Sequence, residues 1–199
     1  MATTVLDMSM SVDGFIAGPN VALDNGLGDG GTRLHEWLLG PDGSFDERRF
    51  ADLTDSDRAV YEELMSTGAV IAGRGTFEPA GGWGGDHHDG VPIFVLSRHP
   101  APPRFADMPL VTYTPDISTA VGRARAAAGD GSILVHGSGA ASMLLAAAEL
   151  DEIQLHVVPV LLGRGRQLVD ELHAQVELEL MSSRQGAEAL HLRYRVRYP

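Results

Sequence analysis

Two short apolar runs in this chain each end in a glycine-rich turn that leads into a predicted helix. Residues 69–72 run into a Gly-Arg-Gly-Thr turn at 73–76, and residues 133–136 run into a Gly-Ser-Gly-Ala turn at 137–140. Glycine lets the main chain turn sharply, and the start of a helix presents unpaired N–H groups to an anion. Such turns also end strands in α/β proteins that hold no phosphate. A third anion-suited turn at Ser97-Arg98 favours a phosphate cradle.

The order of the predicted elements indicates an α/β fold. A first strand is followed by a loop rich in Gly, Asp and Asn from Val12 to about Asp46, after which helical and strand-like segments alternate. Apolar runs without alternation are typical of strands covered on both faces, so we expect a mostly parallel sheet with helices on either side. Strands are predicted at 4–10, 69–72, 92–96, 110–113, 132–136 and 152–160, and helices at 54–68, 116–129 and 140–150.

The last part of the sequence predicts an antiparallel β-hairpin. Val176, Leu178 and Leu180 alternate with polar positions, residues 182–186 are predicted to turn the chain, and apolar residues alternate with His or Arg from 190 to 197. Glutamates on one strand would oppose arginines on the other. We therefore expect charge pairs on a solvated sheet face rather than a binding patch.

Length and composition fit one domain spanning residues 1–199. The chain is 44% hydrophobic and 21% charged, which allows a full core. It contains no cysteine, and this excludes disulfides, thiolate metal sites and a cysteine nucleophile. The longest apolar stretch, near 144–148, is too short to cross a bilayer, and residues 2–10 lack the features of a signal peptide. We expect a cytoplasmic protein without membrane association.

The net charge of −12 argues against a nucleic-acid partner, because it repels a polyanion at long range. A small phosphorylated ligand is still allowed, since salt screens the general field within about 8–10 Å. Arg74, Arg98 and Arg104 would supply a local positive potential.

Five motifs, in this order, resemble the dihydrofolate reductase superfamily, and most closely the C-terminal reductase domain of the bifunctional deaminase-reductase of riboflavin biosynthesis. They are MSVDGFIAG at 10–18, GRGTFE at 73–78, LSR at 96–98, GSG at 137–139 and VPVLLG at 158–163. The resemblance covers nearly the whole chain, from the first strand to the terminal hairpin.

This resemblance implies a three-layer α/β fold, with a largely parallel sheet finished by the C-terminal antiparallel hairpin. It also implies a homodimeric, NADPH-dependent oxidoreductase that acts on a small heterocyclic or imine-type metabolite, similar to 5-amino-6-(5-phosphoribosylamino)uracil reductase. The alternative is a non-catalytic nucleotide-binding or interaction protein on the same fold. No zinc deaminase domain accompanies the motifs, so we expect a stand-alone reductase-like domain.

The resemblance further implies which residues hold the cofactor. Arg74 would face the 2′-phosphate of NADPH, and Thr76 the pyrophosphate or the nicotinamide. Because the fork of donors on arginine matches a phosphate dianion, we expect NADPH to be preferred over NADH. The alternative is that Arg74 and Arg98 pair with acidic neighbours at the surface. The expected cofactor-binding residues are Gly73, Arg74, Thr76, Phe77, Ser97, Arg98, Gly137, Ser138, Gly139 and Ala140.

The expected catalytic and substrate-binding residue is Asp13. Hydride transfer to a C=N or C=O bond leaves charge on the heteroatom, so an acid must supply a proton. Asp13 lies at the carboxyl end of the first predicted strand, where ligands of open α/β sheets collect, although its Asp-Gly pair is also a common turn. His35, Glu36 and Asp46 are further candidates for the proton donor.

Three other residues are expected to bind substrate. Trp37 could wall the pocket against a flat heterocycle or fill the core beneath the long loop. Gly163 and Arg164 could hold a substrate phosphate or form a flexible turn.

The loop at 81–89 carries histidines and a tryptophan. The run Asp86-His87-His88-Asp89 offers metal-ligating side chains, but adjacent histidines on a glycine-rich loop are poorly spaced to converge on one ion, so we expect no metal. Trp83, on the same loop, is expected to form a lid or a subunit contact.

Overall fold

A single sheet of eight strands forms the centre of the protein, which the computed structural model describes for residues 2–40, 47–169, 172 and 174–198. A separate two-stranded sheet joins β2 (Phe15–Ala17) to β8 (Arg166–Gln167). The strands of the large sheet are β1 (Thr4–Ser11), β3 (Ala69–Gly73), β4 (Ile93–Leu96), β5 (Val111–Thr114), β6 (Ile133–His136), β7 (Glu152–Val158), β9 (Glu177–Gln185) and β10 (Leu190–Arg197).

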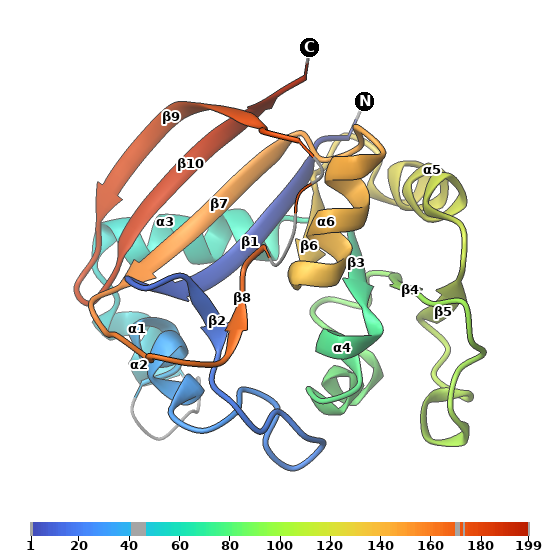
Figure 1. Ribbon diagram of the computed structural model, residues 1–199, viewed down its shortest axis with the longest axis horizontal. Helices are drawn as coiled ribbons and strands as arrows, with labels where there is room; N and C mark the ends of the chain where they lie inside the picture. The colour runs from blue at the N-terminus through green and yellow to red at the C-terminus, as the bar shows by residue number, and fades with distance from the viewer. Residues whose placement is uncertain (1, 41–46, 170–171, 173, 199) are drawn as a thin grey trace.

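The large sheet is mostly parallel, as expected. Its strand order is β5-β4-β3-β6-β1-β7-β10-β9 (Figure 1). Neighbours from β5 to β7 are parallel, whereas β10 runs antiparallel to β7 and β9 antiparallel to β10. The carboxyl ends of β1, β3, β4 and β6 therefore meet at one edge of the sheet.

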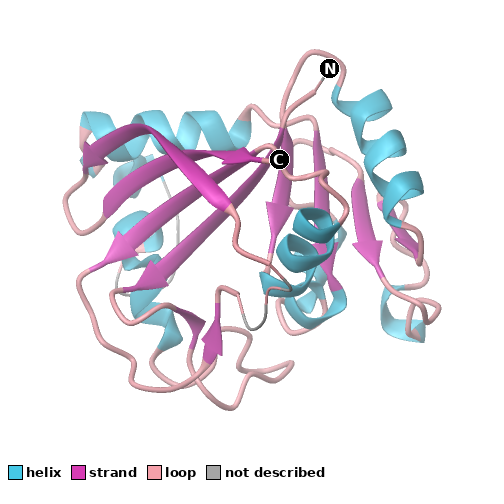
Figure 2. Ribbon diagram, turned by 45° about the horizontal axis from the view of Figure 1, so that its top comes forward, coloured by secondary structure: helices cyan, strands magenta, loops and turns pink. Residues whose placement is uncertain are grey.

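Helices cover both faces of the sheet and complete the three-layer α/β fold expected from the sequence. α5 and α6 pack against β3 and its neighbours on one face, and α3 lies on the other (Figures 1 and 2). None of the described helices is long and apolar enough to cross a membrane. The α-helices are α1 (Glu36–Leu39), α2 (Glu47–Asp52), α3 (Asp55–Met65), α4 (Arg74–Phe77), α5 (Ile117–Ala128) and α6 (Ser138–Ala146), and the 3₁₀ helices are η1 (Gly31–His35), η2 (Gly81–Gly85) and η3 (Pro103–Phe105).

Side-chain caps begin two of the predicted helices. The hydroxyl oxygen of Thr54 accepts a hydrogen bond from the N–H of Asp57 at 3.1 Å, and the carboxylate of Asp116 accepts one from the N–H of Thr119 at 2.8 Å. These bonds satisfy amides that a helix leaves unpaired in its first turn. The helix predicted at 140–150 differs, because it begins at Ser138 and ends at Ala146.

Two parts of the sequence prediction are wrong. β9 continues through the turn predicted at 182–186, because Ser182 and Ser183 pair with β10, and the chain turns only after Gln185. The predicted loop from Val12 to about Asp46 contains β2, η1 and α1 in its described part. The expected charge pairs of the hairpin are present: Arg195 and Arg197 both meet Glu179.

The two faces of β1 differ in character. Leu6 and Met8 lie in the large hydrophobic core beneath α5 and α6. Asp7 and Ser9 alternate with them and therefore point to the opposite face. On that side a smaller core contains Trp37 of α1, Val60 of α3 and Val158 of β7.

Candidate active site

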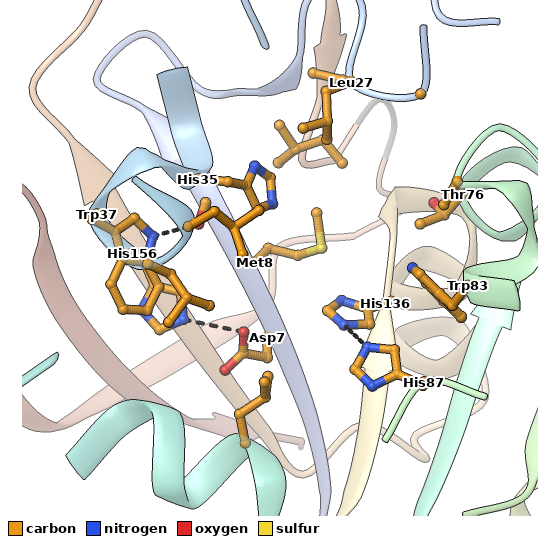
Figure 3. A pocket seen from close by; sticks show the side chains of 18 of the residues that line it. Asp7, Met8, Leu27, His35, Trp37, Thr76, Trp83, His87, His136 and His156 are labelled. Carbon is orange, nitrogen blue, oxygen red and sulfur yellow. Dashed lines mark hydrogen bonds and ion pairs between the residues drawn. The ribbon is translucent and has the colours of Figure 1, made fainter. Parts of the chain in front are cut away.

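A cavity opens where the sheet divides between β1 and β6. The two strands pair only as far as Leu6 with Val135, although β1 continues to Ser11. The cavity measures about 360 Å³ and extends to Thr76, just beyond the end of β3. Figure 3 shows Asp7 of β1 and His136 of β6 on facing sides of it. Open α/β sheets bind their ligands at such carboxyl-terminal edges.

The two glycine turns lie against each other at this edge. β3 and β6 are neighbours, and each ends in its turn, before α4 and α6. Gly137 has a φ of 91°, and a Cβ there would lie 2.0 Å from Oγ1 of Thr76, so glycine is required for this approach. A Cβ on Gly73 would lie 3.5 Å from the amide nitrogen of Ala140. No described side chain caps α6, and the free N–H groups of residues 138–140 suit an anion.

Arg74, expected at the 2′-phosphate, is paired with an acidic neighbour. Its guanidinium donates two hydrogen bonds to the carboxylate of Glu78, at 2.7 and 3.1 Å, and the hydroxyl of Tyr113 donates a third at 3.2 Å. The bond to Glu78 raises the pKa of Arg74, and burial together with Glu78 raises that of Tyr113. This is the arrangement that the sequence left as the alternative. A contact between Arg74 and a phosphate stays a prediction.

The remaining expected cofactor residues have different surroundings. Phe77 is fully buried and packs edge-on against Trp83 and Phe105, so it supports the first glycine turn from within the core, and its contact with a cofactor stays a prediction. Ser97 follows β4 and donates its hydroxyl to the carbonyl of His99 at 2.6 Å, with Arg98 exposed beside it. Ser97 and Arg98 lie at the same sheet edge as the glycine turns, and their contact with a cofactor stays a prediction.

Asp13 lies outside the cavity lining and joins two loops. Its carboxylate accepts hydrogen bonds from the hydroxyl of Ser11 at 2.6 Å and from the N–H groups of Leu162 and Gly163 at 3.1 and 2.7 Å. The bond from Ser11, aided by those from the two amides, lowers the pKa of Asp13, which keeps the group ionised. The geometry is that of a loop anchor, and the catalytic role expected for Asp13 stays a prediction.

Arg166 reaches the cavity, although the sequence analysis did not single it out. Gly163 and Arg164 are exposed on the loop after β7, and their contact with a substrate phosphate stays a prediction. Arg166 lies on β8 and lines the cavity, and its guanidinium donates to the carbonyl of Gly75 at 2.5 Å. The pairing of β8 with β2 thus brings a positive side chain next to the first glycine turn.

Trp37 lies between the cavity and the smaller core. It lines the cavity, and it is also a core residue that is only 4% exposed. Its Nε1 donates to the hydroxyl oxygen of Ser9 at 2.9 Å, and its ring centroid lies 4.7 Å from that of His156 and 4.9 Å from that of His191. A contact between Trp37 and substrate stays a prediction.

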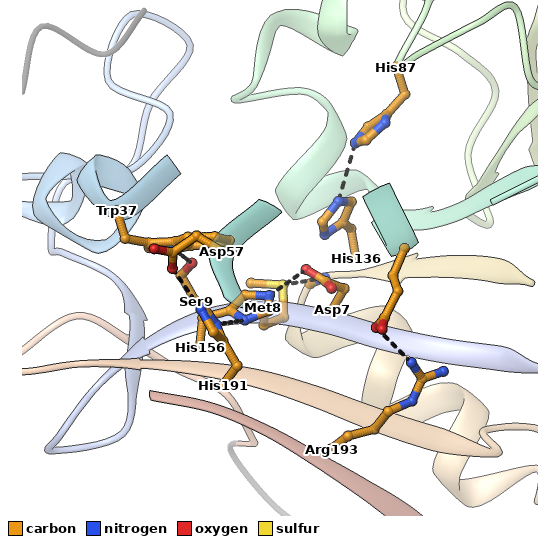
Figure 4. A network of polar contacts seen from close by, with 12 residues as sticks. Asp7, Met8, Ser9, Trp37, Asp57, His87, His136, His156, His191 and Arg193 are labelled. Atoms are coloured by element: carbon orange, nitrogen blue, oxygen red, sulfur yellow. Dashed lines mark hydrogen bonds and ion pairs between the residues drawn. The ribbon is translucent and has the colours of Figure 1, made fainter. Parts of the chain in front are cut away.

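Beneath Trp37, four titratable side chains form a hydrogen-bonded chain, which we call the tetrad (Figure 4). Nε2 of His156 lies 3.1 Å from Oδ1 of Asp7, its Nδ1 lies 2.8 Å from Nδ1 of His191, and Nε2 of His191 lies 2.8 Å from Oδ1 of Asp57. Asp7 and His156 line the cavity, whereas the side chain of Asp57 is 1% exposed. The tetrad therefore connects the cavity to the buried start of α3.

The pKa values of Asp7, Asp57 and His191 are all lowered, but the causes differ between the carboxyl groups and the imidazole. Burial acts to raise the pKa of Asp7, but the charge and hydrogen bond of His156 outweigh it and lower the pKa. Burial likewise opposes the hydrogen bonds from Thr54, Ala187 and His191 that lower the pKa of Asp57. For His191, burial itself lowers the pKa. Both carboxyl groups thus favour the ionised form.

Other histidines line the opposite wall of the cavity. Nε2 of His87 lies 3.2 Å from Nε2 of His136, and its Nδ1 lies 2.7 Å from Nδ1 of His88. Trp83, at an unusual φ of 50°, packs edge-on against the ring of His87 and lines the cavity, so the loop expected to form a lid is part of its wall. Burial lowers the pKa of His87 to about 3.

His35, a candidate proton donor from the sequence, also lines the cavity. Its Nδ1 is closed off from solvent and has no hydrogen-bond partner among the described residues. Burial lowers its pKa to about 4, so the ring is neutral near pH 7. Glu36 lies in α1 and pairs with Arg33 at 3.5 Å. Asp46 lies outside the described residues.

Sequence analysis missed Asp7 and the histidines of the tetrad. His156 and His191 occupy alternating polar positions that read as a solvated sheet face, but Trp37 and α3 cover this part of the sheet. An aspartate in the apolar run of residues 4–10 was the available signal, because an unpaired buried carboxylate is costly.

Metal-ligating side chains do not converge within the described part of the chain, where no group of three or more His, Asp or Glu is arranged to hold an ion. Asp86 accepts a hydrogen bond from the N–H of Gly90 at 3.1 Å. His87 and His88 are hydrogen-bonded to each other instead.

Comparison with known proteins agrees with this architecture. The sequence matches the RibD C-terminal domain family over residues 2–192. The chain belongs to this family. No relative among curated proteins matches the sequence.

Solved structures share the fold of this RibD C-terminal domain. A protein from Shewanella sp. PV-4 assigned to riboflavin biosynthesis is 20% identical, with a TM-score of 0.68 and full coverage of both chains. RibD from Acinetobacter baumannii is 15% identical with a TM-score of 0.64, and the match covers 99% of this chain but 58% of RibD. Dihydrofolate reductase from Enterococcus faecalis, complexed with NADP(H), is 14% identical, with a TM-score of 0.55 over 98% of this chain and 97% of that one.

Proposed function

We propose that this member of the RibD C-terminal domain family is an NADPH-dependent reductase of a small heterocyclic or imine-type metabolite. The observation that carries the proposal is the meeting of two glycine turns beside a cavity of about 360 Å³. Thr76 belongs to both, so a phosphate at the turns and a flat ring in the cavity would be parts of one ligand. The family supports the proposal, and a riboflavin-pathway pyrimidine is the first substrate to test.

The residues at this edge fit a nicotinamide dinucleotide. Free N–H groups at the start of α6 and the hydroxyl of Thr76 suit the pyrophosphate. Apolar side chains that include Ile16, Ala17 and Leu27 line the cavity and suit a planar ring. Bound there, NADPH would supply a hydride to the substrate.

The protein's own side chains would orient the substrate and exclude water. Trp37 and Trp83 provide apolar walls on two sides of the cavity. The ionised carboxylate of Asp7 would accept hydrogen bonds from the N–H edge of a pyrimidine or pterin, and the neutral ring of His35 offers a further polar contact. A small nitrogen heterocycle matches this combination of flat walls and acceptors.

Tryptophan fluorescence tests the proposal directly. The chain contains two tryptophans, and both line the cavity. We expect NADPH to change their emission at lower concentration than NADH, and pyrimidine or pterin substrates to cause NADPH oxidation. Binding without oxidation of NADPH by any substrate would support the non-catalytic alternative, and the absence of binding at millimolar NADPH would refute the proposal.

The homodimer implied by the family resemblance stays a prediction. Analytical ultracentrifugation measures it, with a single sedimenting species of twice the chain mass as the expected result.

A further inference from the structure

We propose that the tetrad of Asp7, His156, His191 and Asp57 stores one proton and delivers it through Asp7 to the substrate reduced in the cavity. The substrate in this inference rests on the proposed reductase function. The stored proton rests on the geometry of the tetrad in the free protein. An experiment can therefore refute the stored proton and the reductase function independently of each other.

The hydrogen bonds of the tetrad need one more proton than its four groups hold in their ordinary ionisation states. Three hydrogen bonds link the four groups, and each needs a proton between its two atoms. Two ionised carboxylates and two neutral imidazoles hold only two protons. If each ring donates its one proton to the neighbouring carboxylate, the Nδ1 atoms of His156 and His191 lie 2.8 Å apart with no proton between them. Their lone pairs then repel each other. A third proton between them removes this repulsion.

The third proton belongs to His156. The pKa values of Asp7 and Asp57 are lowered, which favours carboxylates, and burial lowers the pKa of His191, which favours its neutral ring. His156 then carries protons on both nitrogens and donates to His191 through Nδ1 and to Asp7 through Nε2. An imidazolium with an ionised carboxylate at each end of the chain is a paired buried charge rather than an isolated one.

Other titratable groups near the tetrad do not take over this role. His35 of η1 and His136 of β6 have pKa values lowered chiefly by burial, so both favour the neutral form. Arg193 of β10 is already paired with Glu63 and Glu152 at 3.0 and 2.7 Å. Three further groups face the cavity. Burial lowers the pKa of His87 to about 3, so it favours the neutral form. The other two are Tyr61 of α3 and Arg166 of β8, whose guanidinium is directed to the carbonyl of Gly75.

The far end of the tetrad is sealed from solvent. A Cβ on Gly186 would lie 2.1 Å from Oδ1 of Asp57 and 2.7 Å from Nε2 of His191, so the main chain of the hairpin turn packs directly on this hydrogen bond. Trp37 covers both histidine rings from the other side. Asp7, whose side chain is 13% exposed, is therefore the outlet toward the cavity.

Proton delivery through Asp7 balances the reduction of a C=N bond. His156 first passes its Nε2 proton to Oδ1 of the ionised Asp7, and the ring of His156 becomes neutral. Rotation of the resulting carboxyl group turns the protonated oxygen toward the cavity. As the substrate carbon receives a hydride from the dinucleotide, the π-electron pair moves to nitrogen, which takes this proton and leaves Asp7 ionised. Imine, hydride and proton thus give an amine. A proton that enters from water through the open cavity restores His156 before the next turnover.

Oδ2 of Asp7 is free for this rotation, because no described residue donates a hydrogen bond to it. Asp7 touches the substrate and is the catalytic residue, whereas His156, His191 and Asp57 act through it as positioning residues.

Nitrogen NMR of the histidine rings in the free protein tests the stored proton without any ligand. Near pH 8 we expect His156 to give the signature of an imidazolium and His191 that of a neutral ring, whereas an unperturbed histidine is neutral there. Asp57→Asn should move the loss of the imidazolium signal to lower pH by about one unit. Two neutral rings in the wild-type protein near pH 8 would overturn the inference, whatever activity the protein has.

The pH dependence of turnover tests delivery. Asp57 does not line the cavity, yet Asp57→Asn should move the alkaline limb of kcat by about one pH unit toward acid, because an opposite charge near an imidazolium stabilises it by at least that much. NADPH affinity and KM should stay unchanged. Glu63→Gln removes a partly exposed carboxylate from the same helix and is the control, with its alkaline limb at the wild-type position.

Two further results separate the proposals. Asp7→Asn should lower kcat at every pH and leave NADPH affinity intact, and an alkaline limb unmoved by Asp57→Asn would overturn the delivery step. The protein could also show an imidazolium at His156 but neither bind nor oxidise NADPH. This result would refute the reductase function and the delivery of the proton to a substrate, but not the storage of a proton in the tetrad.

Discussion

Glu78 fills the guanidinium fork of Arg74, which a cofactor phosphate would need for itself. We expect Arg74→Ala to raise the dissociation constant of NADPH about tenfold, the effect of losing a charge-assisted pair, and to leave that of NADH nearly unchanged. Glu78→Gln should do the opposite and tighten NADPH binding, because it frees the fork. Fluorescence titration of both variants with both dinucleotides measures these effects.

Equal weakening of NADPH and NADH by Arg74→Ala would show that Arg74 only supports the fold. An unchanged NADPH affinity in Glu78→Gln would mean that the ion pair persists or that the 2′-phosphate lies elsewhere, and Arg98 would then be the next residue to replace.

Trp37 donates a hydrogen bond from Nε1 to Ser9 that ties the long loop to β1, and its ring covers the tetrad. Trp37→Phe keeps most of the ring but leaves the hydroxyl of the buried Ser9 without its donor. We expect a loss of about 1–3 kcal/mol in the free energy of unfolding, measured by urea denaturation. Trp83→Phe is the matched control, since the described contacts of Trp83 are ring packing, and an equal loss in both variants would contradict the role of the hydrogen bond.

The absence of a side chain at Gly137 lets the turn after β6 lie against the turn after β3. In Gly137→Ala the new Cβ would collide with Oγ1 of Thr76 at a φ of 91°, so we expect a loss of about 1–3 kcal/mol in the free energy of unfolding. Gly139→Ala is the control, because nothing lies within 4 Å of a Cβ there and alanine favours a helix. Thermal denaturation should separate the two, and similar melting temperatures would contradict the close approach of the turns.

The elements that the sequence predicts well are those whose signals are local. The caps at Thr54 and Asp116 fix the starts of α3 and α5, and the unbroken apolar runs predict the buried strands within one or two residues. The hairpin turn was misplaced because Ser182 and Ser183 have turn-like composition, whereas pairing with β10 decides their conformation. β8 was missed for the same reason, since two residues form a strand only against β2.

The described protein buries several histidines in neutral form, and this makes its stability depend on pH. An unfolded histidine takes up a proton below about pH 6.5, whereas the pKa values of His35 and His87 are about 4 and about 3 in the folded protein. Between about pH 6.5 and pH 4 the unfolded state therefore binds more protons than the folded state. Each of the two rings then lowers the free energy of unfolding by about 1.4 kcal/mol for every pH unit of acidification.

Urea denaturation at several pH values between 7 and 4 measures this slope. The lowered pKa values of Asp7 and Asp57 extend the loss of stability to lower pH, because these carboxylates must be protonated on further acidification. His87→Asn should reduce the slope by the share of one ring. A free energy of unfolding that is independent of pH between 6 and 4 would contradict the burial of neutral histidines.

At the scale of the molecule, the sequence could predict the location of the site but not its polar chemistry. Glycine turns at 73–76 and 137–140 indicate the carboxyl edge of the sheet, because their signal is local. The tetrad joins β1, β7, β10 and α3, and which of their polar residues face inward depends on strand register and on Trp37. Asp13 illustrates the converse, since its position after β1 is as expected but its hydrogen bonds are those of a loop anchor.

The tetrad also fixes an order of events during synthesis. Asp7, on β1, leaves the ribosome long before His191, on β10. Until the hairpin docks, the nascent chain holds this carboxylate without a complete histidine chain, and burying it would be costly. Ribosome-bound chains that stop short of β10 should therefore leave β1 and β7 open to proteases, whereas chains that include β10 should protect both strands.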